Sequence, residues 1–308
     1  MDALCQKYPL NKVCFEQCDF TDTAALTTVF NTYQVTTVIY TLRNSFLTHT
    51  DAFMDNYKVS AMLGSITSAI AAAPAVTKFI MVSNTDIYAG NGAPLNKNGK
   101  YDKKDGFNVQ HPYAFLVFLK EKMAHDFYNQ CKRLALVILR VAVPVGSDDL
   151  FFSTYYSHPE TLPRSFQHNL LTHYAGHQKQ LLTIYKSTTN TIDGSVNVNL
   201  ISVKDVATAL YAAHHFLQQQ PRTFKIYNVA YFMSLTAIQW LRALICAADD
   251  DLPSPRFQLV AHTDQKNTAI KLYHTDDTHS DLNWTPLHKP QMELAKLVSW
   301  VVIHQHSF

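Results

Sequence analysis

Buried strand patterns alternate with helical patterns along most of the sequence, and this alternation constrains the fold more than any other feature. Runs of β-branched and apolar residues predict strands at Val13–Cys18, Thr36–Leu42, Lys78–Ser83, Ala135–Val141, Leu181–Tyr185, Asn197–Ser202 and Lys225–Asn228. Helical periodicity is expected at Thr23–Tyr33, Phe53–Ala72, Pro112–Lys132, Pro163–Ala175, Val203–Gln218, Leu235–Ala248 and Gln291–Val302. Such alternation predicts an α/β protein whose parallel sheet is covered by helices on both faces.

Composition and charge exclude several classes of protein. The chain has 308 residues and a formal net charge of +2, which does not indicate a nucleic-acid partner. No apolar run approaches the roughly 18 residues of a membrane helix, so we expect no membrane insertion. The five cysteines have no paired spacing and are interpreted as reduced thiols. We therefore expect an intracellular protein, cytoplasmic by default, with an organelle such as the mitochondrion left open.

Glycine is unusually scarce. Eight glycines in 308 residues are less than half of the usual share of about 7%. No G-x-G-x-x-G or G-x-x-G-x-x-G occurs in the sequence, although a phosphate-binding turn of a dinucleotide site needs such glycines. His173 and His177 are four residues apart, but they have no third-ligand spacing. We therefore expect neither a dinucleotide bound at a glycine-rich turn nor a metal site.

Four segments carry a resemblance to a known family. They are FIMVSNTDIYAG at 79–90, HPYAFLVFLKEKMAHDF at 111–127, LALVILRVAVPVG at 134–146 and TTNTIDGSVNVNLISVKDVATAL at 188–210. Their order and spacing resemble the extended short-chain dehydrogenase/reductase, or NAD-dependent epimerase/dehydratase, family. Among its members the sequence is most similar to the UDP-glucose 4-epimerases.

The resemblance implies a particular domain organisation. It implies a truncated Rossmann-like parallel sheet in which 1–146 is the remnant of a dinucleotide-binding domain without its first βαβ unit. Residues 197–228 would complete this domain. Residues 147–196 and 229–308 would form a smaller, interleaved C-terminal lobe of the substrate-binding type.

The resemblance also implies where catalysis would occur. Tyr113 matches the family's acid/base tyrosine, and Asn84 takes the place of the family's Ser/Thr, with Thr85 as an offset substitute. The family has a lysine four residues after the tyrosine, one helical turn away, and this lysine lowers the pKa of the tyrosine. The corresponding residue here is Val117. An unassisted tyrosine is almost wholly protonated at neutral pH, which argues against catalysis.

Residues that contact the ligands in the family are partly replaced here as well. Asp19 matches an aspartate that contacts adenine in the family, although a role in capping a turn explains it equally well. Two arginines that face the diphosphate in the family are replaced by Val198 and Gln265. Loss of two cations removes charge-assisted hydrogen bonds to a diphosphate. We therefore expect no cofactor, with NAD bound only if the chain is an active epimerase.

Without the first two strands of a doubly wound sheet, Thr36–Leu42 would have an open edge. Val13–Cys18 could close directly onto it, another chain could cover it, or the sequence could be a fragment; direct closure is favoured.

The function we expect is a UDP-glucose 4-epimerase-like protein that is catalytically inactive and serves as a structural or interaction subunit, with a protein partner or a second copy. The alternatives are an active NAD-dependent epimerase of UDP-glucose and UDP-galactose, or a binder of nucleotide sugars without catalysis. A UDP-sugar would be a ligand only in these alternatives.

Overall fold

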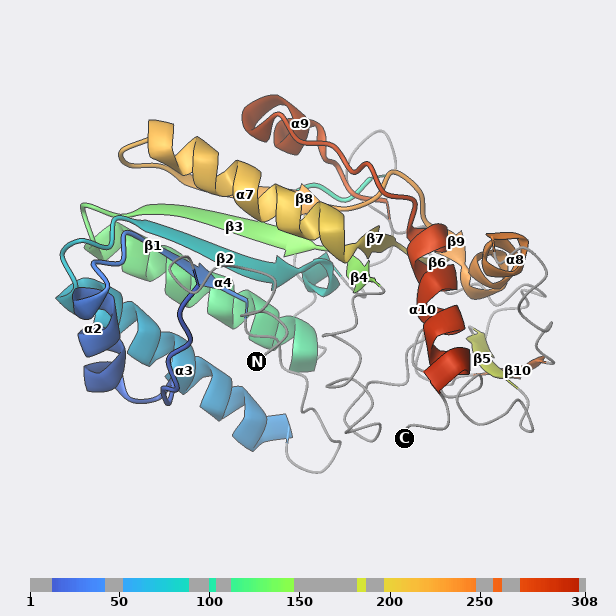
Figure 1. The fold of residues 1–308 in the computed structure, drawn as a ribbon, viewed down its shortest axis with the longest axis horizontal. Coiled ribbons are helices and arrows are strands. Elements are labelled where there is room, and N and C mark those ends of the chain that lie inside the picture. The colour runs from blue at the N-terminus through green and yellow to red at the C-terminus, as the bar shows by residue number, and fades with distance from the viewer. Residues whose placement is uncertain are drawn as a thin grey trace.

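A four-stranded parallel sheet forms the centre of the protein (Figure 1). The structure is a computed structural model, and it describes residues 13–41, 52–88, 100–103, 112–146, 182–186, 197–247, 257–261 and 272–304. The strands of the sheet are β1 (Thr37–Tyr40), β2 (Lys78–Asn84), β3 (Ala135–Val141) and β8 (Phe224–Val229), and they lie in the order β1-β2-β3-β8. All neighbours in this order are parallel. The predicted α/β class with a parallel sheet is confirmed.

Helices cover both faces of the sheet. α2 (Thr23–Thr32), α3 (Ala52–Ala72) and α4 (Pro112–Gln130) lie on one face, and α7 (Val203–Gln219) lies on the other, with α9 (Asp276–Leu282) beyond it (Figure 1). Side chains of β3 alternate between two apolar clusters, because successive residues of a strand point to opposite faces. Leu136 and Ile138 pack on the α3 side, whereas Val137 and Leu139 pack on the α7 side.

The helices begin at capping residues that the sequence provides. The Asp22 side chain accepts a hydrogen bond from the Ala25 amide at 3.0 Å and caps α2. Ser202 caps α7 by accepting from the Lys204 amide at 3.2 Å. Each cap satisfies a backbone donor that the first turn of a helix leaves without a partner.

Short strand pairs and two helices lie beyond the end of the main sheet (Figure 1). β4 (Val143–Val145) pairs with β7 (Leu200–Ser202), β6 (Asn197–Val198) with β9 (Leu235–Thr236), and β5 (Leu182–Lys186) with β10 (Phe257–Ala261). The helices of this region are α8 (Ala237–Ala247) and α10 (Pro290–His304). The boundaries of the two predicted lobes stay a prediction.

One predicted strand is wrong. Val13–Cys18 forms no strand, and among the described residues β1 pairs only with β2. The segment instead approaches the end of α2, where Glu16 accepts a hydrogen bond from the Tyr33 hydroxyl. A strand needs the hydrogen bonds of a neighbouring strand, and no described strand lies beside this segment. The predicted direct closure of Val13–Cys18 onto Thr36–Leu42 is therefore wrong as well.

Most other predicted elements within the described residues are found with small differences at their ends. The predicted strand Asn197–Ser202 is instead divided at Asn199 into β6 and β7, which pair with different strands, and the predicted helix Leu235–Ala248 begins with the strand β9. The predicted helix at Pro163–Ala175 lies outside the described residues. Among the described helices, none combines the length and apolar character that crossing a bilayer requires.

Candidate functional site

The carboxyl ends of β2, β3 and β8 meet at one edge of the sheet, which is where ligands bind in open α/β folds. Ser83 near the end of β2, Arg140 in β3 and Asn228 in β8 bring polar side chains to this edge, and all three are buried. η1 (Thr85–Tyr88) follows β2 directly and packs against α4. The site is therefore built by three adjacent strands and by the helix that covers them.

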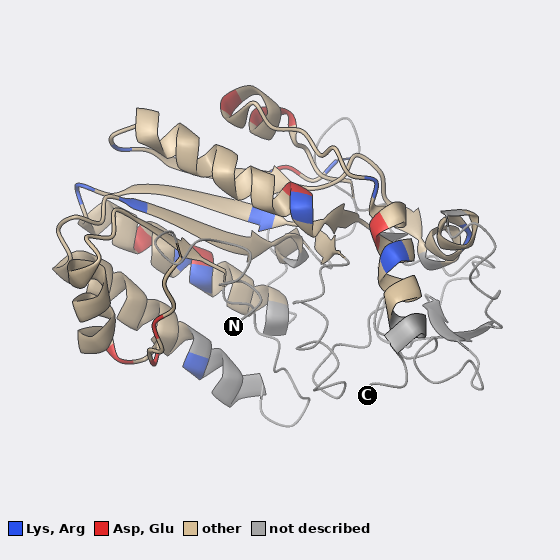
Figure 2. Cartoon of the chain, viewed as in Figure 1, with Lys and Arg blue, Asp and Glu red and all other residues tan. Residues whose placement is uncertain are grey.

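A buried ion pair lies at the centre of this edge. Arg140 is 1% exposed. Its Nη2 donates to Oε2 of Glu121, a residue of α4, at 2.7 Å, and its Nε donates to Oε1 and Oε2 of Glu121 at 3.0 and 3.2 Å. Ser83 donates a further hydrogen bond of 2.5 Å to Glu121. Burial alone lowers the pKa of Arg140, but the facing Glu121 carboxylate outweighs it and raises this pKa. Most of the central sheet is free of charged residues (Figure 2). Arg140 is the charged residue of β3, and Glu121 from the covering helix neutralises its charge.

Tyr88 connects the ion pair to β8. Its hydroxyl accepts a hydrogen bond from Arg140 at 2.7 Å and donates one to the Asn228 side chain at 2.8 Å. Burial raises the pKa of Tyr88 to about 12, although Arg140 opposes this shift. Tyr88 is therefore neutral near pH 7, makes two hydrogen bonds within the network, and is not a base at that pH.

Two chain segments cross this edge and bring further aromatic rings. The Tyr101 amide donates to the Leu272 carbonyl, and the His274 amide donates to the Tyr101 carbonyl, both at 2.8 Å. The rings of Tyr88, Tyr101 and Tyr273 contact one another with centroids 5.5 to 6.1 Å apart. All three tyrosines are buried, so side chains of the protein fill this part of the edge.

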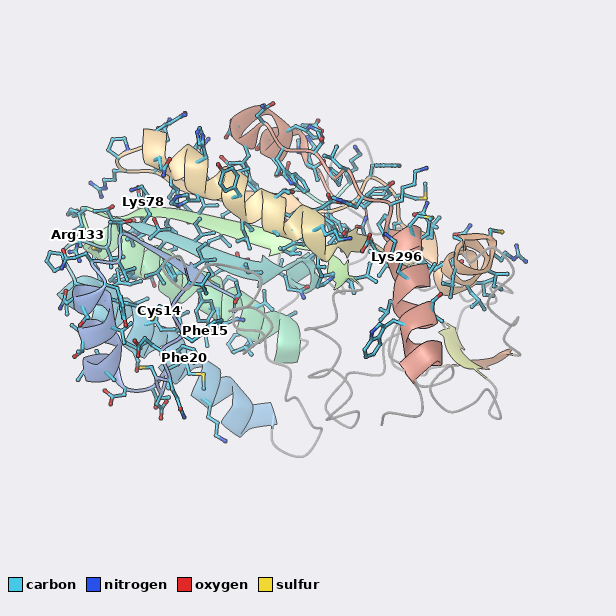
Figure 3. The ribbon with its side chains drawn as sticks, in the orientation of Figure 1. Cys14, Phe15, Phe20, Lys78, Arg133 and Lys296 are labelled. Carbon is cyan, nitrogen blue, oxygen red and sulfur yellow. The ribbon has the colours of Figure 1, made fainter. Side chains whose placement is uncertain are left out.

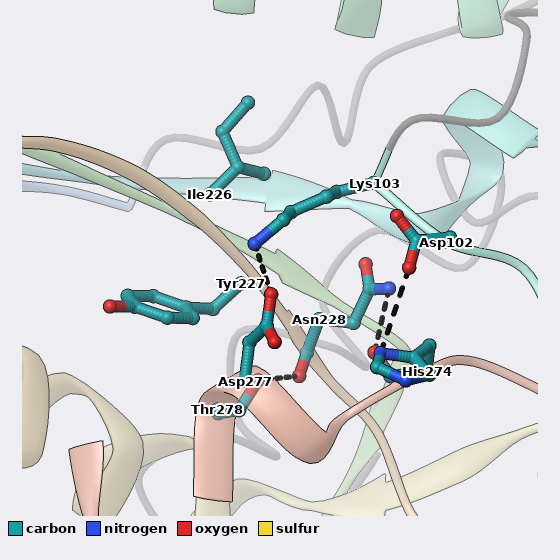
Figure 4. A pocket seen from close by; sticks show the side chains of 8 residues that line it. All are labelled: Asp102, Lys103, Ile226, Tyr227, Asn228, His274, Asp277 and Thr278. Carbon is teal, nitrogen blue, oxygen red and sulfur yellow. Dashed lines mark hydrogen bonds and ion pairs between the residues drawn. The ribbon is translucent and has the colours of Figure 1, made fainter. Parts of the chain in front are cut away.

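A small polar pocket lies beside the crossing (Figure 4). Its volume is about 10 Å³, which is room for a single water molecule. Lys103 forms an ion pair with Asp277, and His274 lies 3.7 Å from Asp102. The hydrogen bond from Lys103 lowers the pKa of Asp277. The pocket is far too small for a nucleotide or a sugar.

The structure places the predicted catalytic residues as follows. Asn84 is the last residue of β2, and Thr85 is buried at the start of η1. Tyr113 is the second residue of α4, but its side chain lies outside the described residues. Val117 is 1% exposed and belongs to the apolar cluster that also contains Ile87 and Val141. The helical position where the resemblance implies a lysine therefore lies in an apolar environment.

Asp19 has a local structural role. Its Oδ1 atom accepts hydrogen bonds from the amide and the hydroxyl of Thr21, each 2.8 Å long. These bonds lower the pKa of Asp19, which is an exposed residue. They form the turn that leads into α2, and the role in adenine binding stays a prediction.

The residues present at this edge do not fit NAD well. The ion pair and the stacked tyrosines occupy the described part of the crevice, and Val117 offers no cation to a ribose hydroxyl. Within the ranges that the structure covers, no group of three His, Cys, Asp or Glu side chains could hold a metal ion. His173 and His177, weighed from the sequence, lie outside the described residues.

Sequence reasoning missed the network around Arg140. A signal was present, because Arg140 interrupts the otherwise apolar strand ALVILRV, and a charge in a strand buried on both faces needs a partner. Glu121, eight residues after Tyr113 on the predicted helix, was a candidate for that partner.

Comparisons with known proteins agree with this fold. The model of the NAD dependent epimerase/dehydratase family matches residues 2–230. A search among curated protein sequences found no match.

Three solved structures illustrate the similarity. UDP-glucose 4-epimerase from Bifidobacterium longum, in complex with NAD+ and UDP, is 17% identical with a TM-score of 0.75, and the match covers 95% of this chain and 84% of that chain. UDP-glucose-4-epimerase from Stenotrophomonas maltophila, with bound NAD and formylated UDP-arabinopyranose, is also 17% identical, with a TM-score of 0.72 and coverage of 96% and 84%. dTDP-glucose 4,6-dehydratase from Bacillus anthracis, in complex with NAD, is 13% identical, with a TM-score of 0.70 and coverage of 98% and 83%. At these identities the matches show a shared fold.

Proposed function

The chain belongs to the NAD dependent epimerase/dehydratase family, and within that family we propose that it is a UDP-glucose 4-epimerase-like protein without catalytic activity that serves as a structural or interaction subunit. The observation that carries this proposal is the environment of Val117. This side chain is 1% exposed and packs in the same apolar cluster as Ile87 and Val141.

The position of Val117 matters because of its relation to Tyr113. Both lie on α4, four residues apart, and therefore on the same helix face. A cation at this position would favour the ionised tyrosine and so supply a base near neutral pH. Valine supplies no charge, and a tyrosine without a neighbouring cation is almost wholly protonated at neutral pH. Proton abstraction from a sugar hydroxyl would then lack a competent base.

The polar network supports the same conclusion. Arg140 and Glu121 satisfy each other, and Asn228 bonds with Tyr88 and with the carbonyls of Tyr101 and His274. These side chains are committed to the fold and are not arranged toward a bound sugar. Their hydrogen bonds connect β3, β8, α4 and the two crossing segments with one another.

Isothermal titration calorimetry of the purified chain with NAD and, separately, with UDP-glucose tests this proposal. We expect no heat of binding from either ligand at millimolar concentration. Saturable binding of UDP-glucose without turnover would instead support a non-catalytic binder of nucleotide sugars. Micromolar binding of NAD would overturn the proposal and would favour an active epimerase that uses Tyr113 and Thr85.

A further inference from the structure

The outer edge of β1 is open in the described part of the structure. Thr36 directs its carbonyl toward β2, where it accepts from the Thr77 and Lys78 amides at 3.1 and 3.2 Å. Successive residues of a strand direct their backbone groups to alternate sides. The amides and carbonyls of Thr37 and Ile39 therefore point away from β2, and no described strand pairs with them.

The side chains of β1 do not protect this edge. Natural proteins block open edges with charged residues, with proline or with a covering element. The strand Thr37–Tyr40 reads TVIY and contains neither a charge nor a proline. Ile39 is 45% exposed, although its neighbours in the sheet centre are fully buried. Such an uncharged edge favours association with another strand.

Exposed apolar side chains are frequent in the described segment that leads up to and includes β1. Of the ten large apolar side chains that are exposed in the described residues, four lie within residues 13–40, namely Phe15, Phe20, Tyr33 and Ile39. Figure 3 shows Phe15 and Phe20 on the segment that leads into α2. A four-residue strand pair alone falls short of the roughly 1,200 Å² that stable interfaces bury, so a dimer formed through β1 needs further contacts between the two copies.

We propose that β1 is a self-association edge, at which a second copy of this chain pairs antiparallel with β1 about a twofold axis through Val38. The proposal deepens the interaction role proposed above and rests on it. In this register Thr37 lies opposite Ile39 of the second copy, and Ile39 lies opposite the second copy's Thr37. Both residues direct their backbone groups outward, so the two pairs form four main-chain hydrogen bonds.

The sequence of β1 selects a second copy as the occupant through its charge and symmetry. A twofold axis through Val38 places Val38 opposite its own copy, and it brings Thr37 and Ile39 close to theirs, so a charge on this strand would lie near a like charge. β1 has none, and it is therefore compatible with itself. The exposed Ile39 side chain would pack on the Thr37 methyl of the second copy, and the two Val38 side chains would meet on the opposite face. The sheet would then continue across both copies.

Sedimentation velocity of the full chain, with two substitutions of Ile39, tests the proposal. Ile39→Pro removes the outward amide, which has no partner within the described chain, and proline is tolerated at an edge strand. Ile39→Lys retains the amide but places a charge one residue from the axis, on the same face as the like charge of the second copy. Tyr211→Lys is the control, because Tyr211 is 72% exposed on α7. Thermal unfolding verifies that each variant is folded.

We expect wild type and Tyr211→Lys to sediment at twice the 34.9 kDa of one chain at concentrations of tens of micromolar, and both Ile39 variants to sediment as monomers. Hydrogen exchange of the Thr37 amide would be slow in the dimer and fast in both variants. A wild type that stays monomeric, or a dimer that survives in folded Ile39→Lys, would overturn the proposal. Neither result depends on NAD or on a UDP-sugar, so failure here is distinct from failure of the proposed function.

Discussion

At the scale of single residues, buried tyrosines in similar surroundings differ in whether their hydroxyls have partners. Tyr88 accepts from Arg140 and donates to Asn228. Tyr40, at the end of β1, is 3% exposed, and its hydroxyl has no hydrogen-bond partner among the described residues. Burial raises the pKa of each to about 12. A buried hydroxyl without a partner costs stability, whereas a bonded one contributes to it.

Substitution by phenylalanine separates these two cases. We expect Tyr88→Phe to lower the free energy of unfolding by about 1–3 kcal/mol, because Arg140 and Asn228 lose a partner. Tyr40→Phe should leave it unchanged or raise it by up to about 1 kcal/mol. Urea unfolding at pH 7 measures both values. Equal losses in the two variants would contradict this account.

The same raised pKa values predict a loss of stability at alkaline pH. The folded state keeps each tyrosine protonated up to about pH 12, whereas the unfolded state releases the proton near 10. The free energy of unfolding therefore falls as pH rises above about 10, by up to about 1.4 kcal/mol per pH unit for each tyrosine. Urea unfolding between pH 8 and 11 should show this fall, and Tyr40→Phe should make it shallower. A flat profile in the wild type would be inconsistent with both shifts.

The ion pair in the core gives a further prediction for single residues. Arg140→Met leaves the Glu121 carboxylate buried without its cation, and we expect a loss of about 3–5 kcal/mol in the free energy of unfolding. The double variant Arg140→Met/Glu121→Leu removes both charges and should be more stable than the single variant. Denaturant unfolding of both compares them. A double variant that is less stable than Arg140→Met would show that the network, and not the lone carboxylate, dominates.

At the scale of elements, the junction between β4 and α7 depends on a glycine. A Cβ atom at Gly146 would lie 2.1 Å from Cγ2 of Val203, the first residue of α7. Because valine is stiff at χ1, its side chain cannot easily move aside. The close approach of strand end and helix start thus requires glycine at this position.

Alanine substitutions test that requirement. Gly146→Ala should lower the free energy of unfolding by about 1–3 kcal/mol through overpacking, and Val203→Ala in the same chain should restore part of the loss. Gly64→Ala is the matched control, because no atom lies within 4 Å of the added Cβ in α3. It should stabilise the protein by about 0.5–1 kcal/mol. Thermal or urea unfolding gives all three values, and a neutral Gly146→Ala would refute the packing argument.

Elements with strong periodicity were predictable from the sequence. The strand Ala135–Val141 was predicted with the bounds that the structure has, because a buried parallel strand is a continuous apolar run. Val13–Cys18 has a similar local pattern but forms no strand, because pairing depends on neighbours that a local pattern does not specify. The positions of Asn84, Thr85 and Val117 followed from the strand and helix predictions. The bonds among Arg140, Glu121 and Tyr88 did not, because they join residues far apart in the sequence.

At the scale of the whole molecule, the sheet extends in one direction from β1. Each strand that follows β1 in the order β1-β2-β3-β8 lies farther from it, so β1 remains at the edge within the described structure. At the carboxyl edge of the sheet, buried side chains of the protein fill the described part. The uncharged strand β1 is the edge at which we propose that a second copy pairs. Under the proposed function, the fold of the family is combined with a site in which Val117 stands where catalysis would need a cation.

Epimerisation is the most direct measurement of the central claim, which is that this chain has no catalytic activity. The purified protein is incubated with UDP-glucose and NAD, and UDP-galactose is quantified by chromatography, with Tyr113→Phe as the control. We predict no UDP-galactose above the level without protein, and no difference between wild type and Tyr113→Phe. Formation of UDP-galactose that is lost in Tyr113→Phe would contradict the account and would show that Tyr113 acts without the lysine that Val117 replaces.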